Sequence, residues 1–472
     1  MASDLVSNAY MQSLLKTVYL SGVTNNKYQA SPILSSIAKE SWGSGKELKF
    51  ATQYGNGGNF GADYNTLFNN ATLGAQNTEW TMKQGHLTGL FTIAQPEILT
   101  SADERGAYMK VLNNKMSACF DGMSKMLATY LYGGMYGVID KIQSDIVLSA
   151  ATEVTIPLTS AGSLKLPVGM RFVIAHGTAD NTALPSSALL SSGVVFTVTS
   201  KTDSSITATT SSAVTGTIYQ GDFIEVYTGR VGATANATAI GPEGLMDIIP
   251  SLADRTGSTW DDYIATSFRG VDRSVSQSEL AGQFVKAAPT GDTRITDALV
   301  SLLKKTKRAG GMDDIIIVND ETWDDIGQEL GVQKTLWQAY NSGDNKNKFT
   351  GGVSQLATAF GDAFISRTVI DPYCTEGLAY MLAKEDLKFY DLGNVAKVIS
   401  PVANDQEGKY EIQAVGDQGI GDDPKIGINI DKLFTIENGS RDTYGPVLTI
   451  APHIYGNYLI RKTASAGVAD VA

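Results

Sequence analysis

Cysteine and histidine are scarce in this chain of 472 residues, which contains two cysteines and three histidines. A disulfide scaffold and a zinc site both need such residues in closely spaced groups. Here Cys119 and Cys374 are far apart, as are His86, His176 and His453. The sequence therefore predicts isolated polar or interface histidines, with no metal site and no cofactor.

Positive charge is also in short supply, since 37 Lys and Arg stand against 49 Asp and Glu, for a formal net charge of −12. Proteins that bind duplex DNA gain much of their affinity by neutralising phosphates and usually present a basic face. No basic run of that kind is visible, so sequence-specific DNA binding is not expected.

Long apolar runs are missing as well. No stretch approaches the roughly 18 apolar residues of a membrane-spanning helix. Residues 1–4 are not followed by the basic and apolar segments of a secretory signal peptide. We expect a protein without membrane contact that is made in a reducing cytoplasm. Its 43% hydrophobic content and its length suit two or three globular domains.

A long amphipathic helix is the clearest positive signal. Ser101 and Glu104 have the spacing of a capping box at a helix start. Gly133-Gly134 suits its end, because glycine readily adopts the left-handed conformation. About 32 residues give a rod of about 48 Å. One face, repeated every three or four residues, consists of Tyr108, Leu112, Met116, Cys119, Met123, Met126 and Tyr130.

A glycine-rich extended segment precedes this helix. Residues 46–54 predict one strand and residues 79–93 a longer return strand, joined by a connection rich in Asn and Gly. Connections of this length are usually functional or mobile. A thin extended segment beside a long rod buries little surface within one chain. We therefore expect both to lie against neighbouring copies.

The segment over residues 150–232 has few charged residues and many Thr and Ser. Residues 194–199 and 206–210 predict a hairpin. Short strands of this spacing indicate a small β-barrel or sandwich. The β-prone runs are residues 171–175, 193–199, 205–210 and 223–227.

Mixed α and β patterns follow residue 233. A helix is predicted after Thr293, with Lys and Arg in its last turns, where cations suit the helix dipole. Residues 315–318 form a continuous apolar run typical of a buried strand. Asn319 or Asp320 is placed to cap the next helix. The apolar face of the first helix consists of Ile295, Leu299, Leu302 and Leu303.

Two sheet strands are predicted near the C-terminus, over residues 447–450 and 454–460. Pro452 lies between them. Because proline cannot donate to a strand ladder, we expect it to break the sheet there.

No motif selects a chemistry. Residues 43–46 (Gly-Ser-Gly-Lys) resemble part of a phosphate-binding loop, but Glu40 and Glu47 occupy the positions of its first glycine and its magnesium-binding Ser or Thr. Acidic clusters at residues 313–314, 320–325 and 417–423 lack EF-hand spacing and are explained by helix starts and a turn. We expect no catalytic, cofactor-binding or metal-binding residues, and no enzymatic activity.

The order of elements resembles that of the major capsid proteins of tailed bacteriophages, with the HK-97-like fold. The most similar segments are residues 241–245 (GPEGL), 270–274 (GVDRS) and 315–323 (IIIVNDETW), together with 378–392, which resembles a strand pair of the family's axial domain. The resemblance implies an α+β fold with six parts. These are an N-terminal arm (1–44), an extended β-hairpin loop (45–95), a peripheral domain with a long spine helix (96–149), an inserted β-barrel or sandwich (150–232), an axial domain (233–405) and the C-terminal part of the peripheral domain (406–472).

The resemblance also implies a function. Such a protein assembles with itself, as hexamers and pentamers, into an icosahedral shell that encloses phage double-stranded DNA without sequence-specific binding. Its other partners would be portal, scaffolding and capsid-decorating or head-fibre proteins. It would reside in the virion after assembly in the host cytoplasm. An acidic chain suits a shell that encloses DNA without binding it tightly.

Other hypotheses stay open. An encapsulin-like protein compartment shares the fold but generally has shorter chains without the insertion. A phage tail or fibre protein, or a cell-surface adhesin, would fit the Thr- and Ser-rich segment. A hydrolase with paired carboxylates also stays open, because 49 acidic residues allow many spatial pairs. Lys46, Lys49 and Lys83 are candidates for a covalent link to a neighbour's Asn, although no crosslinking triad is identifiable.

Overall fold

The computed structural model divides into two units, Met1–Ala30 and Ser31–Ala472. All described residues lie in the second unit. They are residues 31–42, 47–55, 62–63, 76–89, 91–94, 105–135, 137–175, 194–227, 241–249, 267–286, 295–311, 315–329, 367–391, 399–403, 410–414, 427–429 and 447–471. They form a mixed α+β structure with several sheets, so the predicted class is confirmed.

One six-stranded sheet is arranged around β22 (Val447–Ile460), a single strand of 14 residues. The prediction of two strands broken at Pro452 is therefore wrong. Along one edge of β22, β5 pairs with residues up to Ile450, and β4 pairs with residues from His453 onward. Pro452 falls in the gap between them, where a missing N–H is tolerated. The other strands are β1 (Ala38–Ser41), which follows α2 (Pro32–Ser36), β4 (Gly85–Thr88), β5 (Phe91–Ala94), β18 (Leu387–Asp391) and β21 (Gly427–Asn429).

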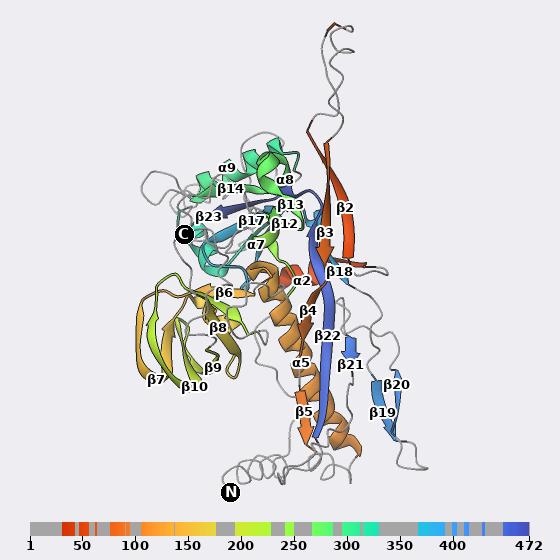
Figure 1. The fold of residues 1–472 in the computed structure, drawn as a ribbon, viewed down its shortest axis with the longest axis vertical. Helices are drawn as coiled ribbons and strands as arrows, with labels where there is room; N and C mark the ends of the chain where they lie inside the picture. The colour runs from red at the N-terminus through yellow and green to blue at the C-terminus, as the bar shows by residue number, and fades with distance from the viewer. Residues whose placement is uncertain are drawn as a thin grey trace, which may run out of the picture. The chain divides into compact units, whose positions relative to one another are not determined.

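A long helix, α5 (Arg105–Gly133), runs beside β22 (Figure 1). It ends where predicted, and Gly134 adopts a left-handed φ of 69°. The hydroxyl of Tyr458 on β22 donates to the carbonyl of Leu127 at 3.1 Å. The predicted capping box at residues 101–104 lies outside the described residues, as do the side chains of Tyr108, Leu112 and Met116. Cys119 and Met126 are half-buried, and Met123, Leu127, Tyr130 and Leu131 are buried.

The described helices include none with the length and apolarity needed to cross a membrane.

A five-stranded sheet has the order β14-β23-β17-β15-β16. Alternate residues of β15 (Ile315–Val318) face two different cores, so all four are buried, as predicted. The predicted helix is α9 (Ile295–Arg308), whose Leu299, Leu302 and Leu303 pack on one face of the sheet, whereas Thr293 lies outside the described residues. The other strands are β14 (Gln283–Lys286), β16 (Arg367–Ile370), β17 (Leu378–Leu382) and β23 (Gly467–Asp470), and β19 (Ile399–Ala403) pairs separately with β20 (Tyr410–Ala414).

The cap of the next helix, over residues 320–329, is Asn319. Its Oδ1 accepts the N–H of Glu321 at 2.9 Å, and its carbonyl accepts the N–H of Trp323 at 2.9 Å. Of the two predicted capping residues, the first is therefore confirmed.

The chain passes directly between the sheet around β22 and the five-stranded sheet at two places. A short 3-10 helix, η5 (Lys384–Asp386), leads from β17 to β18, and another, η6 (Thr463–Ser465), leads from β22 back to β23. The segment 378–392 forms two strands that do not pair with each other, so the expected strand pair is wrong. β17 is already paired with β15 and β23, and β18 with β1 and β22, which leaves neither strand a free edge.

A separate six-stranded sheet, here called the β-rich unit (residues 138–227), has the order β6-β11-β8-β9-β10-β7. The predicted hairpin is confirmed by the register Ala208↔Val198 and Thr209↔Thr197. The sheet begins before residue 150, because it contains β6 and the first part of β7. Its elements are β6 (Val138–Lys141), β7 (Ile146–Pro157), α6 (Ser160–Lys165), β8 (Arg171–Ala175), β9 (Phe196–Lys201), β10 (Ser205–Ile218) and β11 (Phe223–Val226).

The glycine-rich segment contains a hairpin of β2 (Glu47–Tyr54) and β3 (Gln76–Lys83), in register from Glu47↔Lys83 to Tyr54↔Gln76. One face is turned to the protein: Trp80 is 2% exposed and stacks on Phe50 with centroids 6.1 Å apart. Part of the hairpin is therefore buried within its own chain, contrary to expectation. The cluster beneath it consists of Trp42, Met82, Tyr390 and Leu459, with Leu48 and Phe50 packed against it.

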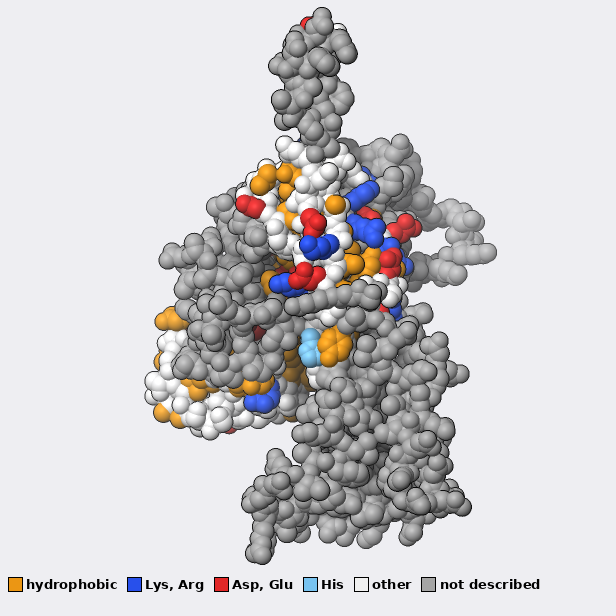
Figure 2. Space-filling view, turned by 45° about the vertical axis from the view of Figure 1, so that its right-hand side comes forward, with side chains coloured by type: hydrophobic (Ala, Val, Ile, Leu, Met, Phe, Trp, Pro, Cys, Tyr) orange, Lys and Arg blue, Asp and Glu red, His pale blue; other side chains and the backbone are white. Residues whose placement is uncertain are grey.

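The predicted return strand over residues 79–93 is interrupted. It consists of β3, β4 and β5, and the last two pair with β22. On the outer face of the hairpin Lys49 and Glu79 form an exposed ion pair of 2.6 Å. Figure 2 shows Lys and Arg side chains interspersed with Asp and Glu on the face that carries the hairpin.

The hairpin face that Trp80 covers yields a stability prediction. Trp80→Ala should lower the free energy of unfolding by about 3–5 kcal/mol, because truncating a large buried side chain leaves a cavity. The neighbouring Glu79→Ala, on the exposed face, should change it by less than about 1 kcal/mol. Urea unfolding followed by circular dichroism measures both. Equal effects of the two substitutions would contradict the burial of this face.

Candidate assembly site: the hairpin and its anchor

A tight turn between β12 (Ser267–Phe268) and β13 (Val271–Asp272) contacts the hairpin. Its central residues, Arg269 and Gly270, have φ values of 51° and 83°, the signs of a type I′ turn. Glycine adopts this conformation freely, whereas arginine rarely does. The Arg269 carbonyl accepts the N–H of Thr81 on β3 at 2.9 Å. Strain of this kind persists only where surrounding contacts enforce it.

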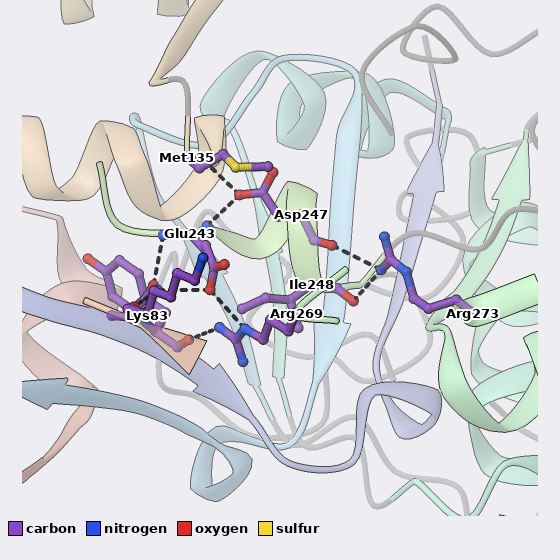
Figure 3. Close-up of polar contacts among 10 residues, drawn as sticks. Lys83, Met135, Glu243, Asp247, Ile248, Arg269 and Arg273 are labelled. Atoms are coloured by element: carbon purple, nitrogen blue, oxygen red, sulfur yellow. Dashed lines mark hydrogen bonds and ion pairs between the residues drawn. The ribbon is translucent and has the colours of Figure 1, made fainter. Parts of the chain in front are cut away.

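Those contacts come from the Arg269 side chain (Figure 3). This side chain is 1% exposed. Its Nε donates to Glu243 Oε2 at 2.8 Å, and its terminal nitrogen donates to the carbonyl of Tyr458 at 2.6 Å. Glu243 is 16% exposed, so the pair is largely removed from water. Charge-assisted bonds in such surroundings are stronger than those between neutral groups.

Asn457 on β22 extends this network to the hairpin. Its amide nitrogen donates to Glu243 Oε2 at 2.8 Å and to the carbonyl of Lys83 at 3.0 Å. Its amide oxygen accepts the N–H of Glu243 at 2.7 Å. The last residue of β3 is therefore tied to β22 and to the segment that holds Glu243.

A second carboxylate, Asp247 on α7 (Leu245–Ile248), ties in the end of α5. Its Oδ2 accepts the N–H of Gly244 at 2.9 Å and the N–H of Met135 at 2.7 Å. The buried guanidinium of Arg273 donates to the Asp247 carbonyl at 3.0 Å and the Ile248 carbonyl at 3.3 Å (Figure 3). We call Glu243, Asp247, Arg269, Arg273 and Asn457 the anchor cluster.

An aromatic ring joins the anchor cluster to the inner face of the hairpin. Phe268 meets Trp80 edge to face, with centroids 6.3 Å apart. The guanidinium groups of Arg269 and Arg273 each lie 4.9 Å from the Phe268 centroid. Cations over an aromatic face are attracted to it, most strongly where water is excluded.

Two glycines permit the close approach that this arrangement needs. A Cβ on Gly244 would lie 2.2 Å from the Tyr130 carbonyl oxygen at the end of α5. A Cβ on Gly85, at the start of β4, would lie 2.5 Å from the Cα of Pro242. Any side chain at either position would push the segment over residues 241–249 away from α5 or β4.

Burial raises the pKa of Asp247 to about 7, an effect that Glu243 reinforces and that the N–H groups of Gly244 and Met135 oppose. Burial also lowers the pKa of Arg273 to about 10, against the attraction of Asp247. A buried carboxylate without a full counter-charge keeps its proton to a higher pH.

The far end of the described hairpin has a contact of its own. The N–H of Gly55 donates to Glu279 Oε2 at 3.1 Å, and the hydroxyl of Ser276 donates to the same oxygen at 2.9 Å. Glu279 lies on α8 (Gln277–Leu280), which follows the 3-10 helix η4 (Arg273–Ser276). The hairpin is thus held at both ends of its paired strands.

The residues considered for chemistry do not come together. His86 stacks on Tyr455 with centroids 4.7 Å apart. Cys374 is buried and Cys119 half-buried, and both are free thiols. Within the described ranges no three His, Cys, Asp or Glu residues are grouped so as to hold a metal ion. His176, the side chain of His453, Lys46 with the rest of residues 43–46, and the acidic clusters at 313–314 and 417–423 lie outside the described residues.

Comparison with solved structures identifies the fold. A chain of the cyanophage A-1(L) capsid asymmetric unit is similar with a TM-score of 0.52 at 12% identity, over 98% of this chain and 99% of that chain. The capsid of a native GTA particle gives a TM-score of 0.41 at 8% identity, over 98% of both chains. Mycobacterium phage Ogopogo gives 0.38 at 10% identity, over 98% of this chain and 99% of that chain.

No protein-family model matches the chain, and a search of curated proteins finds no match. The cyanophage likeness covers nearly the whole of both chains. The chain therefore has the fold of a phage capsid chain.

The anchor cluster was not predicted from the sequence. Residues 241–245 and 270–274, the segments that carry the resemblance, contain Glu243 and Arg273. Glu243 bonds to Arg269, and Arg273 bonds to the carbonyls of Asp247 and Ile248. Nothing in the sequence indicated these contacts. The Arg269-Gly270 dipeptide was a usable signal, because glycine in such a pair favours a tight hairpin turn.

Removing the Arg269 side chain tests the anchor cluster. Arg269→Ala should lower the free energy of unfolding by about 3 kcal/mol, because it leaves the largely buried carboxylate of Glu243 without its counter-charge. Arg269→Gly also removes the side chain, but glycine adopts the left-handed backbone without strain. It should therefore recover only part of the lost free energy of unfolding. Arg308→Ala, an exposed arginine on α9, is the control. Denaturant unfolding measures all three variants. If the midpoint of Arg308→Ala were as low as that of Arg269→Ala, the stabilising role of the Arg269–Glu243 pair would be contradicted.

The pKa of Asp247 yields a pH prediction. Its folded pKa of about 7 lies above the ordinary value of 3.8, so its contribution to stability is fully present below pH 3.8 and is lost as the pH rises through 7. Asp247→Asn lacks this titration. The stability difference between wild type and variant should therefore shift in favour of the variant by about 1.4 kcal/mol per pH unit across that window. Parallel unfolding curves from pH 4 to pH 7.5 measure it, and a constant difference would refute the assignment.

Proposed function

We propose that this chain is the major capsid protein of a tailed bacteriophage. In this role it is a structural protein without enzymatic activity that assembles as hexamers and pentamers into an icosahedral shell around double-stranded DNA. The observation that carries the proposal is the likeness to the cyanophage capsid chain, with a TM-score of 0.52 over nearly the full length of both chains. The net charge of −12 fits a container that encloses DNA without specific binding.

The proposal assigns the described elements to the parts of an HK-97-like subunit. We assign the hairpin with residues 45–95 to the extended loop, α5 to the spine helix, and the sheet around β22 to the peripheral domain. The sheet of β14 to β17, with β23 and α9, would be the axial domain, and residues 1–44 the N-terminal arm. The β-rich unit would be the insertion. We place its start near residue 138, because β6 belongs to its sheet.

The anchor cluster gives the proposed extended loop a defined direction. A loop that is already held in place loses less conformational entropy when it meets a neighbour, which strengthens the contact. Its outer face, with Lys49 and Glu79 exposed, is polar and suits a reversible contact during assembly. Many modest contacts per subunit then add up to a stable closed shell, provided that each contact repeats around a ring.

The proposal includes the partners and location expected of such a protein. Copies of the chain itself are the main partner, joined by portal, scaffolding and capsid-decorating or head-fibre proteins. Assembly takes place in the host cytoplasm and the protein ends in the virion.

Electron microscopy of the purified protein, alone and co-expressed with its neighbouring genes, tests the function. Closed polyhedral shells, or rings of five and six subunits, are the expected result. Shells that contain DNA would favour a virus over an enzyme-filled compartment. A small monodisperse particle under every condition would overturn the proposal.

A loop deletion tests how assembly works. Tyr54 and Gln76 are opposite each other in the register, so an Asn-Gly turn can join them in place of residues 55–75. The variant should unfold at the wild-type denaturant concentration, because the buried face of β2 and β3 is kept, but it should form no closed shells.

The deletion also removes the contact between Gly55 and Glu279. Glu279→Ala removes that contact, and the bond from Ser276 to the same carboxylate, but keeps the loop. It is the matched control and should still assemble. Normal shells from the deletion variant would show that the loop does not hold neighbours together.

A further inference from the structure

Residues 31–42, here called the strap, join two separate parts of the structure. The strap consists of α2, the short strand β1 and Trp42. β1 lies at the edge of the sheet around β22 and, among the described strands, pairs with β18 alone. A strand of four residues that is paired on one side is a weak attachment, so the two ends of the strap decide how firmly it is held.

The first end of the strap is held by a buried carboxylate. Oδ2 of Asp371, which follows β16, accepts hydrogen bonds from the hydroxyl of Ser31 and from the hydroxyl of Tyr132 on α5, the latter at 2.8 Å. Its Oδ1 accepts the N–H of Tyr373 at 3.0 Å. The Ser31 oxygen also accepts the N–H of Leu34 at 3.3 Å. The residue that caps α2 is therefore the residue that ties it to Asp371.

Apolar packing adds to this hold. Ile33, Leu34 and Ile37 are buried in the large core cluster. The N–H of Asp371 donates to the carbonyl of Val318 on β15 at 2.9 Å. Figure 1 shows α2 beside the end of α5. The first end of the strap is therefore fixed to α5 and to the five-stranded sheet together.

The second end of the strap lies under the hairpin. Trp42 is buried, and its N–H donates to the carbonyl of Asp391 on β18 at 2.5 Å. Its side chain packs in the cluster that contains Met82 on β3, together with Tyr390 and Leu459. The buried indole nitrogen of Trp42 has no hydrogen-bond partner among the described residues. The indole is therefore held by packing, which depends on the position of the hairpin.

The middle of the strap is held more lightly. Ala38 and Ser41, at the two ends of β1, are exposed. Glu40 forms an ion pair with Lys388, but the two side chains are 36% and 30% exposed, and such pairs contribute little. Because β1 follows α2 almost directly and Trp42 follows β1, little slack separates the two ends.

We propose that the strap opens and closes as one unit and thereby couples the hairpin to Asp371, so that loosening either end loosens the other. Opening would uncover the edge of β18 and the apolar cluster under the hairpin at the same time. Local openings of this kind commonly involve contiguous cooperative units. The inference concerns contacts within one chain and does not depend on the proposed capsid function.

Hydrogen exchange of the full chain tests the coupling from the hairpin side, under conditions where the opening equilibrium limits exchange. Met82→Ala removes packing around Trp42 and should speed exchange of the Trp42 N–H at least about fivefold. The N–H groups of Leu34 and Ile37, which bond to Ser31 Oγ and to the Ile33 carbonyl, should exchange faster by the same factor.

Met381→Ala is the matched control for this variant. Met381 is 0% exposed, like Met82, but lies on β17 in a different core cluster. It should leave the exchange of the strap unchanged. Faster exchange at Trp42 alone in Met82→Ala would overturn the proposal, because the two ends would then open separately.

Ser31→Ala tests the coupling from the other side. It removes the cap of α2 and the bond to Asp371, and should speed exchange of the Trp42 N–H and of the β1 amides roughly tenfold. Ser36→Ala is the control, because the Ser36 hydroxyl bonds only within α2, to the Ile33 carbonyl at 2.9 Å. It should leave Trp42 unchanged. Faster exchange confined to α2 in Ser31→Ala would refute the coupling.

Discussion

The ion pair between Arg269 and Glu243 is the interaction on which the described fold depends most. It is largely removed from water, and its partners come from the β12–β13 turn, the segment before α7, the hairpin and β22. Removing one partner of such a pair is costly, because the other charge is left without its counter-charge. The pair therefore holds the hairpin, β22 and the segment before α7 in one arrangement. The left-handed backbone of Arg269 indicates that local conformation has been adapted to the side chain's position.

Local patterns were enough to predict many elements. The long helix and its end at Gly133, the buried strand at residues 315–318, the cap at Asn319 and the hairpin in the β-rich unit all depend on neighbours in the sequence. Periodicity and capping report on such neighbours directly. The α+β class follows from the same signals.

Pairing between distant segments was harder to predict. The sequence shows that residues 378–392 contain two strands but not that each already has two partners elsewhere. It shows Pro452 but not the gap that accommodates it. The anchor cluster draws on residues from Glu243 to Asn457 and bonds to Lys83 on β3. Apart from the Arg269-Gly270 dipeptide it leaves no local pattern, because each residue is ordinary until its partner is known.

The position of β23 has a consequence for the timing of folding. β23 lies inside its sheet, between β14 and β17, yet β14 precedes it by a large part of the chain. During synthesis β14 has no partner until β23 is made much later. Until then, the edge of β17 that pairs with β23 also stays open. Contacts between such distant segments form slowly and expose strand edges in the interval. A nascent chain therefore cannot complete this sheet early, and a chaperone or rapid synthesis of the last segment would protect it from premature association.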